Sequence, residues 1–139
     1  MLNNETLSYI DGLIDMASSC DEYVGPSYIR LFSFNSSDYI NQFKKTFKID
    51  FDDNLLFESD ETIEDVFIEL LGKNNIYDCF MYHFSKIVPE GQIIRFDEEY
   101  KIFDMLGGTK GLSGFYFVED LAFIKFEDTV LCFIMGNNE

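Results

Sequence analysis

Hydrophobic residues in the first two-thirds of the chain recur three and four positions apart, the spacing that places them on one face of a helix. The clearest stripe follows Ser59 or Asp60, either of which could cap a helix that Gly72 would end. The same spacing predicts further helices over residues 5–19, over 38–47 with a cap at Ser36 or Ser37, and from Asn74 or Asn75 to a break at Pro89.

The last third of the chain has the composition of β-strands. Four segments are rich in β-branched and aromatic residues, namely 92–96, 115–118, 121–126 and 130–135. The acidic pairs Glu119-Asp120 and Glu127-Asp128 separate the last three segments and predict turns. We therefore expect an antiparallel meander, with the wholly apolar segment 130–135 as a central strand covered on both faces.

Three other segments are less regular. Residues 28–34 indicate one short strand among the helices, whereas residues 98–106 fit a helix or a strand. Glycines between positions 107 and 114 predict a mobile loop. Together the pattern predicts an α+β fold over a single domain, residues 1–139, in which N-terminal helices pack on a C-terminal antiparallel β-meander.

The charge of the chain is strongly negative, because 26 acidic residues face 10 basic ones and leave a net charge of −16. Such a field repels nucleic acid and anionic membranes and attracts basic proteins, although the acidity could also serve solubility alone. The chain also holds 16 Phe and no Trp. This surplus implies a bulky aromatic core or an aromatic patch kept for contact.

Cysteine usage and the start of the sequence favour a cytoplasmic protein. The cysteines are Cys20, Cys79 and Cys132, an odd number without motif spacing, as is typical of free thiols in a reducing compartment. The first residues lack the basic and apolar segments of a signal peptide, and the apolar run 130–135 is too short to cross a bilayer. We expect no membrane contact.

The densest charge lies between Asp50 and Asp65, where eight carboxylates occur without a Lys or Arg. Carboxylates in a loop and on the next helix turn would face a basic patch, and apolar residues among them would supply anchors. We expect the partner-binding residues to be Asp50, Asp52, Asp53, Phe57, Glu58, Asp60, Glu61, Glu64 and Asp65.

Two other interpretations of this stretch remain open. It could be a solvated loop followed by carboxylates that the dipole of the next helix favours. It could also be a calcium loop in a regulatory domain, since Asp50, Asp52, Asn54, Glu58 and Glu61 fall at ligand positions of an EF-hand. Against calcium, Leu55 stands where the sharp turn of that loop needs Gly.

Signals for catalysis are weak. His83 is the single histidine, and no nucleophile, zinc or phosphate-loop motif is present. The segment from Gly107 to Gly111 lacks the spacing of a P-loop. We therefore expect no enzymatic activity, no catalytic residues, no bound metal and no cofactor.

In size, acidity and its Asn-, Ile-, Phe-, Lys- and Asp-rich composition, the whole chain resembles the small acidic immunity proteins of bacterial contact-dependent growth inhibition and related polymorphic toxin systems. The segment 115–139, which ends Ile134-Met135-Gly136-Asn137-Asn138-Glu139, is also similar to such families. The resemblance implies an inhibitor that neutralises a basic toxin domain, often a nuclease, by forming a tight occluding complex. It assigns a role to no individual residue.

Overall fold

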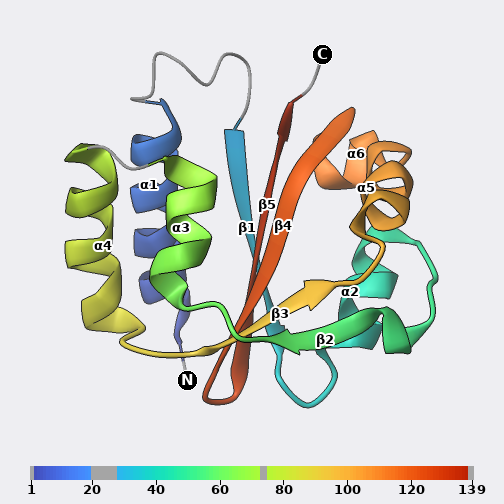
Figure 1. Ribbon diagram of the computed structural model, residues 1–139, viewed down its shortest axis with the longest axis horizontal. Coiled ribbons are helices and arrows are strands. Elements are labelled where there is room, and N and C mark those ends of the chain that lie inside the picture. The colour runs from blue at the N-terminus through green and yellow to red at the C-terminus, as the bar shows by residue number, and fades with distance from the viewer. Residues whose placement is uncertain (1, 20–27, 73–74, 138–139) are drawn as a thin grey trace.

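An antiparallel sheet runs through the middle of the computed structural model, which describes residues 2–19, 28–72 and 75–137 (Figure 1). The order of its five strands is β1-β5-β4-β3-β2, so β1 and β2 form the two edges. The strands are β1 (Tyr28–Asn35), β2 (Leu56–Ser59), β3 (Gln92–Phe96), β4 (Phe117–Phe126) and β5 (Thr129–Asn137).

Helices cover both faces of this sheet, as the two sides of Figure 1 show. One layer consists of α1 (Asn4–Ser19), α3 (Ile63–Leu71) and α4 (Asn75–Ile87). The other consists of α2 (Tyr39–Phe47), α5 (Glu99–Gly107) and α6 (Lys110–Ser113), with a short 3-10 turn, η1 (Asp53–Leu55), before β2. The predicted α+β class is confirmed, and the helices form two layers around the strands.

Each face of the sheet buries its own hydrophobic core. The α1, α3 and α4 side packs Ile14, Val66 and Phe80 against alternate residues of the inner strands. On the other side, Phe43 of α2 lies at the centre of a cluster of rings, with centroids 4.9 Å from Phe47 and 5.3 Å from Phe123. Most of the Phe surplus is therefore buried, which leaves few phenyl rings at the surface.

The predicted meander is confirmed in its order and corrected at one turn. Strands β4 and β5 pair antiparallel up to Phe126 and Thr129, with Glu127 and Asp128 in the turn between them, and β5 lies between β1 and β4 as expected of a central strand. The turn predicted at Glu119-Asp120 is wrong, because residues 117–126 form one strand with a bulge between Val118 and Asp120. Asp120 is only 4% exposed there, although an acidic residue would be expected to face solvent.

Two segments between β3 and β4 form helices in the structure. Residues 98–106, which fitted either state, contribute α5, and the predicted glycine-rich loop instead contains α6. Gly114 ends α6 at a φ of 85°, which favours glycine. No residue with a side chain fits at position Gly107, because the backbone oxygen of Tyr116 lies where a Cβ atom would be.

The start of α2 differs from prediction in its cap. Asp38, not Ser36 or Ser37, occupies the N-cap position, and its side chain makes no capping hydrogen bond. Asn74, one of the two residues predicted to open α4, lies outside the described part of the chain. Among the described helices, none combines the length and the apolar character needed to cross a membrane.

Candidate functional site

The acidic stretch from Asp50 to Asp65 does not form a single patch. It leaves the α2 side of the sheet, follows the edge strand β2 and ends in the first turn of α3 (Figure 1). Eight of its nine predicted contact residues therefore fall into three groups with different surroundings, and the ninth, Glu61, lies apart from them.

In the first group, the carboxylates are already engaged within the chain. Lys44 Nζ of α2 lies 2.7 Å from Asp53 Oδ1 and 3.1 Å from Asp50 Oδ1, and also over the ring of Phe51. The hydrogen bonds to Asp53 and Asp50 raise the pKa of Lys44, and the bond from Lys44 lowers the pKa of Asp50. Asp52 accepts from the amide of Asn54 and caps η1. This group is partly neutralised before any partner arrives.

The second group lies on β2 and just beyond it. Phe57 is 47% exposed and stands opposite Arg95 in the register of β2 and β3. The next residue, Glu58, faces the α2 side. Tyr39 on that side has a raised pKa, of which burial is the largest cause and the charge of Glu58 the second. Glu58 and Asp60 are exposed and make no ion pair within the described residues. They remain available to a partner.

The third group begins α3, and its cap corrects the prediction. Thr62, not Ser59 or Asp60, is the N-cap: its hydroxyl accepts from the amide of Asp65, whose carboxylate accepts from the amide of Thr62. Asp65 therefore has a structural role. Glu64 is exposed beside it.

Glu61 is only partly exposed and is engaged by an arginine that lies far from it in sequence. Arg95 Nε donates to Glu61 Oε1 at 2.8 Å and Nη2 donates to Oε2 at 2.9 Å, which makes a bidentate pair. The same Nη2 donates to Glu69 of α3 at 2.7 Å. Nη1 donates to Asp120 of β4 at 2.9 Å and to the backbone oxygen of Leu121 at 2.8 Å. All five N–H groups of this buried guanidinium are thus used.

This group of Arg95, Glu61, Glu69 and Asp120, the Arg95 cluster, carries three carboxylates for one guanidinium. Burial alone would lower the pKa of Arg95, but the hydrogen bonds to Glu61 and the charge of Asp120 raise it. The hydrogen bond from Arg95 lowers the pKa of Glu61.

Asp120 and Glu69 behave differently from Glu61. Asp120 Oδ2 is buried and has no hydrogen-bond partner among the described residues, although both Asp120 and Glu69 bind Arg95. Burial raises the pKa of both groups, and the charge of Asp120 raises that of Glu69 further. The raised pKa values favour the protonated form of both carboxyls.

The sequence contains a signal for this cluster that lies outside the acidic stretch. Arg95 stands between the apolar residues Ile94 and Phe96 of β3, at the alternate position from Ile93. A charged side chain at an inward-facing strand position requires buried partners. Which carboxylates would meet it depends on the pairing of β3 with β2 and β4, which local pattern does not specify.

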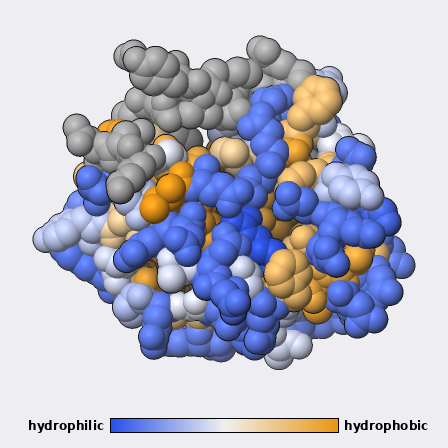
Figure 2. Space-filling view, in the orientation of Figure 1, coloured by the Kyte–Doolittle hydropathy of each residue, from blue (hydrophilic) through white to orange (hydrophobic). Residues whose placement is uncertain are grey.

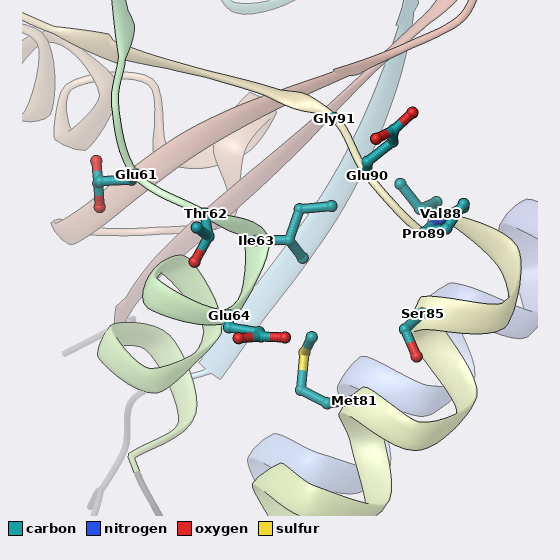
Figure 3. Close-up of a pocket in the computed structure, with 10 residues that line it drawn as sticks. All are labelled: Glu61, Thr62, Ile63, Glu64, Met81, Ser85, Val88, Pro89, Glu90 and Gly91. Carbon is teal, nitrogen blue, oxygen red and sulfur yellow. The ribbon is translucent and has the colours of Figure 1, made fainter.

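A pocket of about 350 Å³ lies between the start of α3 and the connection from α4 to β3 (Figure 3). Glu64 and Met81 point toward one another across it, and Ile63 and Val88 supply apolar walls. Glu90 lies at its rim, and Glu61 extends away from it. The hollow adds a mixed apolar and acidic recess to the end of the acidic stretch.

Comparison with known proteins finds no matching family model, no matching curated protein and no matching solved structure. A function must therefore be argued from the chain's own geometry.

The calcium loop suggested by the sequence is not formed. Residues 56–59 are a strand, Asp50 pairs with Lys44, and Glu61 pairs with Arg95, so the proposed ligands do not converge. Within the described residues, no three His, Cys, Asp or Glu side chains are grouped to hold a metal ion.

The remaining reactive side chains lie apart from the acidic stretch. His83 is half-buried on α4, with Nδ1 3.4 Å from the hydroxyl of Tyr9. Cys132 is buried in β5, where burial raises the pKa of its thiol, and Cys79 is exposed on α4. Cys20 lies outside the described residues.

Proposed function

We propose that the protein binds a basic protein through the β2–α3 edge, which we define as the exposed side chains of Phe57, Glu58, Asp60 and Glu64, and that it is not an enzyme. The observation that supports this most directly is the 47% exposure of Phe57 beside carboxylates that make no ion pair within the described residues. An exposed phenyl ring can anchor an interface, while the carboxylates around it select a basic surface.

The charge of the whole molecule favours the same partner. Hydrophilic side chains dominate the face seen in Figure 2, and hydrophobic ones interrupt it only in small groups. With a net charge of −16, the protein attracts cationic surfaces over a range set by the ionic strength. Association with the basic partner is therefore fast at low salt and slower at high salt.

In its most specific form, the proposal is that the partner is a toxin domain, such as a nuclease, and that the protein is its cytoplasmic inhibitor. A nuclease cleft is lined with basic groups that hold phosphates. An acidic edge can occupy such a cleft by the same electrostatics and exclude the substrate. The compositional resemblance to immunity proteins supports this form.

Affinity capture with matched variants tests the proposal. Tagged wild-type protein is incubated with lysate of the source organism at ionic strengths of about 0.05 M and about 0.5 M. We expect it to retain a basic protein, identified by mass spectrometry, more strongly at low salt. Phe57→Ala combined with Glu58→Lys should lose that protein.

Phe117→Ala is the matched control, since Phe117 is also an exposed phenylalanine on a strand, at 62%. It should retain the partner. Retention by the Phe57 variant together with loss by Phe117→Ala would refute the β2–α3 edge. If the partner is a toxin domain, the purified partner should show an activity that an equimolar amount of the protein abolishes.

A further inference from the structure

The outer edge of β2 carries backbone groups that the sheet does not use. The amide of Asp97 donates to the oxygen of Leu55 at 2.6 Å. These two residues continue the register of β2 and β3, so they show which opposite residues of the two strands form hydrogen-bonded pairs. Because bonded and non-bonded pairs alternate, Phe57 and Ser59 bond to β3 and Glu58 turns its N–H and C=O to the open edge. Among the described residues, β2 is the last strand of the sheet on this side, as Figure 1 shows.

A second copy of the chain does not suit this edge. Antiparallel pairing of two β2 strands around Glu58 would bring like charges face to face, with Asp60 and Glu64 close by, and like charges opposite one another destabilise a sheet. Repulsion between two molecules of charge −16 adds to this penalty. The carboxylates that protect the edge from self-association favour a strand with cationic side chains.

We propose that β2 binds an extended, lysine- or arginine-rich segment of the partner as an additional strand of the sheet. This inference rests on the proposed function and adds the way in which the partner is held. Backbone hydrogen bonds to Glu58 supply part of the affinity. Side chains on the two faces of the added strand supply the specificity.

The surroundings of β2 specify the pattern of that segment. Glu58 lies on the α2 face and Phe57 on the opposite face, beside the Arg95 cluster. Since successive side chains of a strand point to opposite faces, a basic residue next to Glu58 places its neighbour next to Phe57. The segment therefore alternates basic and hydrophobic residues.

Two synthetic peptides of equal charge test this mode of binding. The first has about eight residues that alternate Lys and Val, and the second has Pro in place of each Val, so that it cannot form a strand. We expect the Lys–Val peptide to bind the full chain at least about threefold more tightly than the Lys–Pro peptide. Amide hydrogen exchange measured by NMR should show the Glu58 amide protected by the Lys–Val peptide.

Proline variants isolate the backbone contribution. Glu58→Pro removes the outward N–H without removing a bond to β3, and Glu58→Gln removes the charge alone. Glu58→Pro should bind the Lys–Val peptide about threefold to tenfold more weakly than Glu58→Gln. Ser33→Pro, on the opposite edge strand β1, should leave binding unchanged, and circular dichroism checks that each variant is folded.

The outcomes separate this inference from the proposed function. Equal binding of both peptides, with an unprotected Glu58 amide, would show that charge alone attracts them, which overturns strand addition and leaves the basic partner intact. Binding weakened by Ser33→Pro instead of Glu58→Pro would assign the edge to β1 and also overturn it. No binding of either peptide would contradict the electrostatic selection on which both proposals rest.

Discussion

At the scale of single residues, Arg95 joins three otherwise separate parts of the chain. Its guanidinium, on β3, binds Glu61 before α3, Glu69 within α3 and Asp120 on β4. A buried ion pair of this kind contributes little net stability compared with apolar packing, but it is costly to break. The cluster therefore fixes where α3 lies on the sheet.

Removal of Arg95 tests this role. Arg95→Ala leaves three carboxylates facing one another, one of them buried, and should lower the free energy of unfolding by about 3 kcal/mol. Urea denaturation gives the value. Lys101→Ala, which breaks the exposed pair of Lys101 with Glu98, should lower the free energy of unfolding far less. Equal losses in the two variants would contradict a positioning role for Arg95.

The raised pKa values of Glu69 and Asp120 predict a pH dependence of stability. Both pKa values are raised in the folded protein above the ordinary 4.5 of Glu and 3.8 of Asp. At pH values between the ordinary and the raised pKa values, the folded state thus binds more protons than the unfolded state. Stability therefore falls as the pH rises through the raised pKa values. Asp120→Asn keeps an oxygen for Arg95 and provides an N–H for Glu69, so it should flatten this fall.

The measurement is the free energy of unfolding between about pH 5 and about pH 8. Relative to wild type, Asp120→Asn should gain stability steadily with pH. Glu64→Gln removes one charge from an exposed position of α3 and serves as the control. Parallel curves for wild type and Asp120→Asn would show that the pair holds no extra proton.

At the scale of elements, the start of α3 depends on the reciprocal bonds of Thr62 and Asp65. Thr62→Ala removes the side-chain acceptor for an otherwise unpaired amide and should lower the free energy of unfolding by about 1 kcal/mol. Asp60→Ala, at a position that sequence alone also marks as a cap, should have little effect on stability. Thermal unfolding of the two variants distinguishes them, and a larger loss for Asp60→Ala would reverse the assignment.

Elements with a strong local period could be predicted, and those decided by distant contacts could not. The stripe of Ile63, Val66 and Leu70 predicts α3 correctly, because burial of one face is what stabilises the helix. Asp120 lies in an acidic pair that is typical of a turn, yet Arg95 compensates its burial within a strand. Local sequence contains no information on that partner.

The same distinction holds for the candidate site. The sequence correctly marks the stretch around Phe57 and Glu58 as acidic and exposed. It does not reveal that Lys44 already engages Asp50 and Asp53, or that Glu61 faces Arg95. Long-range pairing thus reduces the predicted surface to the β2–α3 edge.

At the scale of the whole molecule, the charge of −16 acts on a fold stabilised by two apolar cores. Mutual repulsion of surface carboxylates opposes the compact state, and salt screens it. Raising NaCl from about 0.02 M to about 0.5 M at neutral pH should therefore increase the melting temperature. A melting temperature that is flat or falls would mean that the exposed ion pairs contribute more than the repulsion does.

The place of β5 in the sheet has a consequence for how the protein is made. In the sheet that the described residues form, the one strand that pairs with β1 is β5, with Tyr28 opposite Gly136, so the neighbour of β1 is translated long after it. During synthesis, α1 and β1 emerge early but find no sheet to join until the chain has been made as far as Asn137. Newly made chains therefore wait with an apolar strand exposed, and premature termination before β5 yields a product that cannot close its sheet and becomes a substrate for chaperones and proteases.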